Sequence, residues 1–253
     1  MKQIIYLLLA IAITVSCNSK KEKEPGISFS TSEYKEDVNL ADSKGVSVKA
    51  EIPIAEGDSV IVKSINDRVF ATVQSLISQE DDNSKSYTEL FKSFTNSYTT
   101  FAKDYPDVPG KWEAIVKGTV EHNSSNIINI KLDSYTITGG AHGMSYNISL
   151  LFSPKTGKEL FITDIISDTT ALRQIAEPKF RTKYNIPPSA NINSTGFMFE
   201  NDTFVLPQNF FITKEGLLLL YNRYEIAAYV QGMKEILIPY NEINKYLLID
   251  LDK

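Results

Sequence analysis

Strand-type and helix-type hydrophobic patterns follow one another in this chain without regular alternation, and this order constrains the fold most. Apolar and polar residues alternate from Val46 to Ile54, as in a strand with one buried face. Helical spacing follows from Ile61 to Ile77 and again from Tyr87 to Phe101. Further strand patterns come next, several of them separated only by short turns. This order favours an α+β fold with mainly antiparallel sheet over a doubly wound parallel fold.

Capping residues predict where three helices begin. Asp58 or Ser59 precedes the first helical pattern, and Ser86 with Glu89 matches a capping box before the second. Asp168 is placed to cap a third helix that runs toward residue 184. A proline at position 178 is expected to kink or interrupt that helix.

The remaining patterns predict strands grouped into two small mixed subdomains, with helices packed on one face. Residues 112–122 and 128–132 form a hairpin, and a further strand covers 146–152. Three more strands are expected at 209–213, 217–222 and 234–239, before a short helix near residue 241. The continuous apolar run Leu217–Leu220 indicates a central strand buried on both faces.

The first 16 residues have the pattern of an export signal. Lys2 is followed by the apolar stretch Ile4–Val15, which is shorter than the ~20 residues needed to span a bilayer. The chain's single cysteine, Cys17, comes directly afterwards, as in a bacterial lipoprotein signal, although Thr14 stands where leucine is usual. The alternative is an ordinary cleaved signal in which Cys17 is a late apolar residue.

The lipoprotein interpretation predicts a membrane-anchored mature chain. Residues 1–16 are the signal peptide, and residues 17–26 comprise a lipidated Cys17, carrying acyl chains such as palmitate, and a polar tether. Asn18, where aspartate would favour retention in the inner membrane, favours the outer membrane of a Gram-negative bacterium. The membrane is therefore one expected partner, reached through the lipid.

Composition excludes several classes of function. The chain has 26 Lys+Arg against 31 Asp+Glu, a formal net charge of −5, which opposes general nucleic-acid binding. One cysteine excludes an internal disulfide, and two histidines oppose a multi-histidine metal site. No G-x-S-x-G or H-E-x-x-H motif is present. We therefore expect no metal, no cofactor and no enzymatic activity.

Two groups of residues are candidates for ligand binding. His142 lies in a glycine-rich turn whose backbone N–H groups could hold an anion or a glycan hydroxyl; the alternative is a tight connection whose histidine bonds the backbone. Tyrosines at 221, 224 and 229 flank Arg223 and Glu225, which suits glycan or protein recognition or, alternatively, core packing. His122 is expected to be a partly exposed structural histidine. The candidate ligand-binding residues are Gly139, Gly140, His142, Gly143, Tyr221 and Tyr224.

The segment TGGAHG (138–143) and the segment 209–243 resemble an RsiV-like C-terminal domain of unknown function. The matching elements are Tyr224–Ala227 and Ile238–Tyr240, and residues 46–70 are similar to the PdaC-type domain that often precedes it. The resemblance places domains at 27–137 and 138–253 and implies an extracytoplasmic setting. Known contexts of this family are the sensing segment of a lysozyme-responsive anti-sigma factor, the non-catalytic region of a peptidoglycan deacetylase, and lipoproteins of unassigned function.

The lipoprotein-type signal and the family resemblance together predict a lipid-anchored cell-envelope protein without enzymatic activity. Its expected ligand is peptidoglycan or another glycan, or a wall-associated protein such as lysozyme. An alternative is a hydrolase of envelope glycan that uses His142 with an unidentified carboxylate. A third possibility is a purely structural partner in an envelope complex.

Overall fold

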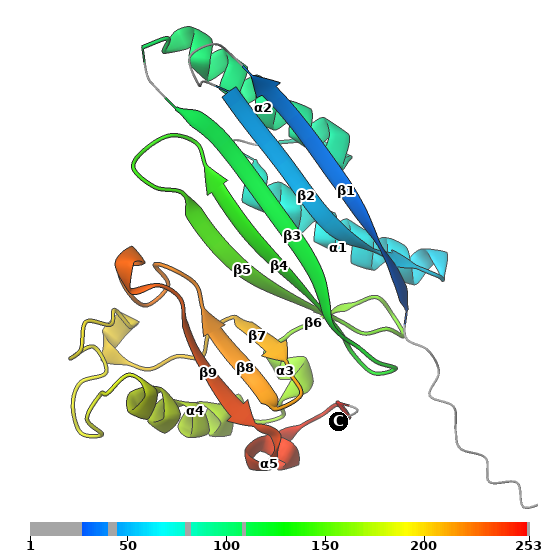
Figure 1. Cartoon of the computed structure of the whole chain (residues 1–253). Helices are drawn as coiled ribbons and strands as arrows, with labels where there is room; N and C mark the ends of the chain where they lie inside the picture. The colour runs from blue at the N-terminus through cyan, green and yellow to red at the C-terminus, as the bar shows by residue number, and fades with distance from the viewer. Residues whose placement is uncertain (1–26, 40–44, 79–81, 108–109, 252–253) are drawn as a thin grey trace, which may run out of the picture.

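The computed structural model describes residues 27–39, 45–78, 82–107 and 110–251 (Figure 1). The predicted signal peptide, the lipidated Cys17 and the tether lie outside the described residues. Within the described part of the chain, no helix has both the length and the hydropathy needed to cross a bilayer.

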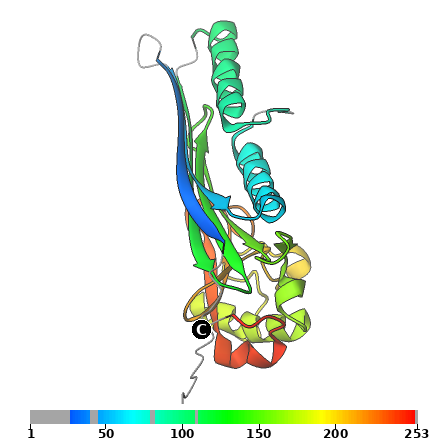
Figure 2. The ribbon, with the colours of Figure 1, turned by 90° about the vertical axis from the view of Figure 1, so that its right-hand side faces the viewer.

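A six-stranded sheet forms the larger layer of the molecule, with its strands in sequence order (Figure 1). Every neighbouring pair is antiparallel except β2 and β3, which are parallel. Two helices lie in the crossover between those two strands and cover one face of the sheet, as Figure 2 shows. The elements are β1 (Ser28–Asn39), β2 (Gly45–Glu56), α1 (Ser59–Ile77), α2 (Tyr87–Asp104), β3 (Lys111–Asn123), β4 (Ile128–Ile137), β5 (Met144–Phe152) and β6 (Glu159–Leu160).

Both crossover helices begin where their capping residues predict. Asp58 accepts hydrogen bonds from the backbone N–H groups of the next turn of α1. Ser86 Oγ accepts from the N–H of Glu89 at 3.3 Å. The Glu89 carboxylate reaches back one residue further than a capping box requires, to the N–H of Lys85 at 2.7 Å.

A three-stranded antiparallel sheet forms the second layer, with β8 in the middle. The central position of β8 confirms the prediction from the apolar run Leu217–Leu220. Helix α4 packs against this sheet and continues through Pro178, so the expected interruption there is wrong; Pro178 is exposed and removes only one helical N–H donor. The elements are α3 (Ile162–Ile165), α4 (Thr169–Lys183), η1 (Glu200–Asp202), β7 (Asn209–Ile212), β8 (Gly216–Tyr221), η2 (Tyr229–Gln231), β9 (Lys234–Pro239), α5 (Tyr240–Ile243) and η3 (Asn244–Tyr246).

This architecture confirms the α+β class with mainly antiparallel sheet. The sequence-based boundary between residues 137 and 138 separates β4 from β5, which pair along their length in one sheet. The six-stranded sheet ends only at Leu160, and the second hydrophobic core is built mainly from residues beyond that point. The structural division therefore lies after β6.

Two buried asparagine side chains join the layers. Asn129 on β4 donates to Ser149 Oγ at 2.8 Å and accepts from the N–H of Ile212 on β7 at 3.0 Å. Asn222, just after β8, uses its carboxamide to bond both the N–H and the C=O of Asn147 on β5, at 2.8 and 3.0 Å. These amides connect the two sheets, which the described residues do not join by strand pairing.

The outer edge of β9 is hydrogen-bonded by the side chain of Tyr184, the residue that follows α4. The Tyr184 hydroxyl accepts from the N–H of Glu235 at 2.8 Å and donates to its C=O at 3.1 Å. Both backbone groups of this edge residue are therefore satisfied within the molecule.

Candidate functional site

The glycine-rich connection between β4 and β5 meets the connection that follows β8. The Tyr229 hydroxyl, from η2, donates to the C=O of Gly143 at 2.9 Å. We call the group His142, Arg223, Tyr224 and Tyr229 the Tyr229 surface. It brings together segments that are about 80 residues apart in sequence.

Aromatic and cationic groups are stacked on this surface. The His142 ring lies on the Tyr229 ring, with centroids 4.3 Å apart and an interplanar angle of 16°. The Arg223 guanidinium carbon lies 4.6 Å from the centre of the same ring, and its Nη1 donates to the Tyr229 C=O at 2.9 Å. The Tyr224 ring centroid lies 5.5 Å from that of Tyr229. His142 and Arg223 thus both pack on the Tyr229 ring, and His142 and Tyr224 are the exposed aromatic members of the group.

The glycines of the connection serve two purposes. Gly139 and Gly140 have φ values of 100° and 83°, in the region predicted for them. Gly143 is needed for space, because a Cβ there would lie 2.5 Å from the Tyr135 ring. The His142 Nδ1 lies 3.4 Å from the C=O of Gly143, a weak version of the backbone contact that sequence analysis left open as an alternative.

Tyr224 holds a conformation that a bulky residue rarely adopts. Its φ is 65°, and 51% of its surface is exposed. The N–H of Glu225 bonds the C=O of Asn222 at 3.2 Å, and the Glu225 carboxylate accepts from the N–H of Asn222 at 2.8 Å. This closed turn holds Tyr224 outward despite the unfavourable backbone geometry.

Tyr221 does not join the surface, so its assignment as a ligand-binding residue is corrected. It is fully buried; its hydroxyl donates to the C=O of Val205, and its ring packs against Phe180 and Phe199. Tyr221 is the last residue of β8, and the alternation of that strand turns it toward the core.

The charge of the Tyr229 surface is positive. Within the described ranges, neither Arg223 nor the neighbouring Lys234 has a carboxylate partner. Burial, together with the charge of Arg223, lowers the pKa of Lys234. Burial also raises the pKa of Glu225, opposed by its bond from the Asn222 N–H. The surface therefore suits ligands with anionic or hydroxyl groups beside a flat apolar face.

The geometry gives no support to acid–base chemistry at His142. Among the described residues it contacts the Tyr229 ring and the Gly143 carbonyl, and no carboxylate bonds its ring. No cluster of three metal-ligating side chains occurs in the described part of the chain.

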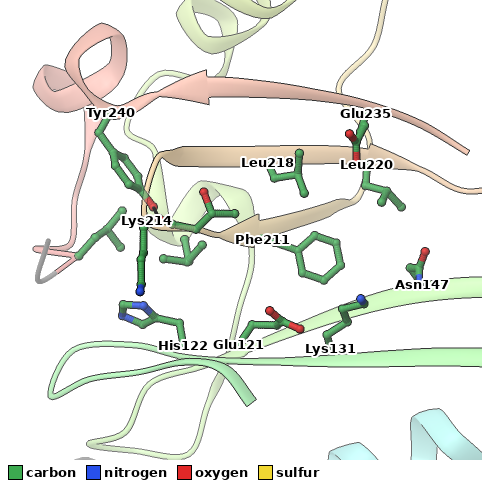
Figure 3. A pocket seen from close by; sticks show the side chains of 13 residues that line it. Glu121, His122, Lys131, Asn147, Phe211, Lys214, Leu218, Leu220, Glu235 and Tyr240 are labelled. Atoms are coloured by element: carbon green, nitrogen blue, oxygen red, sulfur yellow. Dashed lines mark hydrogen bonds between the residues drawn. The ribbon is translucent and has the colours of Figure 1, made fainter. Parts of the chain in front are cut away.

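A cleft of about 780 Å³ lies between the two layers and was not foreseen from the sequence. Figure 3 shows its walls: strands β3, β4 and β5 on one side, and β7, β8 and β9 on the other. His122 lines one end of it. Periodicity showed that Phe211, Leu218 and Leu220 lie in strands, but which strand faces oppose each other depends on how the layers pack.

Models of two families match successive parts of the chain. A model described as "Deacetylase PdaC" matches residues 41–145, and one described as "Protein of unknown function (DUF3298)" matches residues 158–241. The chain contains a PdaC-type domain followed by a DUF3298 domain. This is the order that the resemblance predicts, and the finer assignment of the second domain as RsiV-like stays a prediction.

Solved structures of DUF3298 proteins share the fold. A DUF3298 family member from Bacteroides fragilis is 18% identical, with a TM-score of 0.70 over 89% of this chain and 95% of that one. A DUF3298 family protein from Pseudomonas aeruginosa is 15% identical, with a TM-score of 0.59 over 87% and 94%. No curated protein matches the chain.

Proposed function

We propose that the protein is a non-enzymatic, lipid-anchored binding protein of the cell envelope that recognises peptidoglycan glycan through the Tyr229 surface. The observation that carries the proposal is the exposed Tyr224 ring, held at a positive φ beside the stacked His142 and Tyr229 rings. The anchor is Cys17, and the proposed location is the outer membrane.

The chemistry of the surface supports a glycan ligand. Aromatic rings provide apolar area with a polar edge at a low cost in conformational entropy, which suits the C–H face of a sugar ring. The Tyr224 hydroxyl and the outer imidazole nitrogen offer hydrogen bonds to sugar hydroxyls. Arg223 and Lys234 favour the carboxylates that wall polymers carry.

The domain content supports the setting. The PdaC and DUF3298 domains indicate a cell-envelope-associated protein of unknown function. The export pattern of residues 1–17 agrees with this setting and comes from a separate part of the sequence. Backbone strain at an exposed aromatic residue is typical of functional positions.

Co-sedimentation with purified peptidoglycan tests the proposal. Residues 18–253, which retain every described residue, should pellet saturably with the wall polymer. Tyr224→Ala and His142→Ala should each weaken this binding about tenfold, as expected for the loss of one stacking contact of 1–2 kcal/mol. Tyr105→Ala is the matched control, because Tyr105 is an exposed tyrosine at the end of α2.

The outcomes separate the possible ligands. No pelleting by the unchanged protein would rule out direct wall binding. Surface plasmon resonance against lysozyme would then test a protein ligand. Loss of that signal in Tyr224→Ala would show that the Tyr229 surface binds a protein. Release of soluble sugars from peptidoglycan, abolished by His142→Ala, would favour the hydrolase alternative.

A further inference from the structure

The cleft between the layers has two walls of opposite character. Phe211, Leu218 and Leu220 cover the wall formed by β7 and β8, as Figure 3 shows. Phe211 and Leu220 are almost fully buried, yet they belong to neither of the two hydrophobic cores. Their neighbours along the strands point to the opposite face and pack on α4. The apolar wall therefore lies outside both hydrophobic cores and borders the cleft.

The facing wall is polar. Glu121, Lys131 and Asn147 project from β3, β4 and β5 toward the apolar wall (Figure 3). Lys131 is paired with Asp133 at 3.0 Å, and the Asn147 carboxamide donates to the same aspartate. A ligand between these walls has to offer an apolar face on one side and hydrogen-bonding groups on the other. A sugar ring does so, whereas an acyl chain would offer no hydrogen-bond donor to the Glu121 carboxylate, which has no ion pair among the described residues.

A lysine without a partner marks one end of the cleft. Lys214, in the turn between β7 and β8, extends toward His122 in Figure 3. In the part of the chain that the structure describes, Lys214 has no hydrogen bond or ion pair. Of the other charged side chains that line the cleft, Lys131 pairs with Asp133 and Glu235 pairs with Lys183 at 3.4 Å, whereas Glu121 has no ion pair among the described residues. The positive charge at this end therefore favours an anionic group on the ligand.

From these walls and this charge, we propose that the cleft is a binding site for a carboxylated sugar. The ring would lie against Phe211 and Leu218, its hydroxyls would face Glu121 and Asn147, and its carboxylate would meet Lys214. The volume of about 780 Å³ is typical of a small-molecule site and accommodates more than one ring. Asn129 and Asn222 fix the two walls relative to each other before any ligand arrives, which lowers the entropy cost of binding.

This site shares no residue with the Tyr229 surface, so it can be tested independently of the proposed function. Chemical-shift titrations of ¹⁵N-labelled residues 18–253 would use two pairs of probes. Methyl glucuronide is paired with methyl glucoside, and N-acetylmuramic acid with N-acetylglucosamine, which lacks the lactyl ether; only the first member of each pair carries a carboxylate. At least one acid should bind about tenfold more tightly than its neutral partner, with shifts centred on β7, β8 and the Lys214 turn.

Variants distinguish a specific effect of the Lys214 charge from a general attraction of anionic sugars to the protein. Lys214→Met should abolish the preference for the acid while leaving the weak binding of the neutral sugar. Leu218→Gln should weaken both members of a pair. Lys92→Met, at an exposed lysine on α2, removes the same charge elsewhere and should change nothing. Thermal melts of each variant confirm that the fold is retained.

Each outcome decides the proposal. Preference for the muramic acid alone identifies a wall-derived ligand, and preference for the glucuronide identifies an acidic polysaccharide. Equal binding of acid and neutral sugar, or an acid preference that survives Lys214→Met, would overturn the proposal. Tighter binding of dodecanoate than of either acid would also overturn it and would make the cleft a lipid site.

Discussion

Tyr224 is a bulky residue in a backbone conformation that asparagine and glycine adopt at lower cost. We expect Tyr224→Asn to raise the free energy of unfolding by about 0.5–1 kcal/mol, because the strain is relieved, while peptidoglycan binding is weakened. Urea denaturation measures the first effect and co-sedimentation the second. A loss of stability would show that the contact with Tyr229 outweighs the strain.

Asp82 should make the stability of the fold depend on pH in the acidic range. Burial raises its pKa, but bonds from Ser84, Ser93 and Gln74 outweigh burial and lower the pKa from 3.8 to about 2. A carboxyl group with a depressed pKa stabilises the folded state above its unfolded pKa, and this contribution disappears as pH falls toward the folded value. The difference in melting temperature between the wild type and Asp82→Asn should therefore be constant above pH ~5 and narrow between pH ~4 and ~2. Asp107→Asn, at an exposed aspartate, should show no such narrowing.

Local patterns were sufficient for most helices and strands and failed for one long strand. The starts of α1, α2 and α4 followed from Asp58, Ser86 and Asp168, because capping is a short-range interaction. Strand β1 was missed, since its sequence SFSTSEYKEDVN is mostly polar. It is an edge strand, where charged side chains are favoured, and only a few residues such as Tyr34, which stacks on Tyr87 at 4.4 Å, connect it to the core.

Strand β7 depends on a buried amide from another strand. Asn129→Leu would leave the N–H of Ile212 and the hydroxyl of Ser149 without this partner, at an expected cost of about 2–3 kcal/mol in unfolding free energy. Chemical denaturation measures this loss. Asn96→Ala, at an exposed position on α2, is the matched control and should change stability by less than about 0.5 kcal/mol. An equally small effect of Asn129→Leu would mean that apolar packing and the remaining hydrogen bonds, such as those between Asn222 and Asn147, dock the layers without this amide.

The assembly of the layers could not be predicted from the sequence. Periodicity shows which side of a strand is apolar, but the hydrogen bonds between the sheets come from Asn129 and Asn222, which nothing in the local pattern distinguishes from loop asparagines. For the same reason, only part of the candidate site could be predicted from the sequence. Its glycines and His142 form a short motif, whereas the contact between His142 and Tyr229 depends on the tertiary fold. The local sequence did not distinguish Tyr221, whose side chain points into the core, from Tyr224, whose side chain is exposed.

The hydroxyl of Tyr184 affects how whole molecules behave toward one another. It satisfies both backbone groups of Glu235, so the outer edge of β9 offers an incoming strand an incomplete template. We expect Tyr184→Phe to show concentration-dependent dimers or higher assemblies in sedimentation velocity, whereas Tyr105→Phe stays monodisperse. By occupying the backbone groups of Glu235, a single phenol oxygen is thus expected to limit pairing between the β9 edges of two molecules.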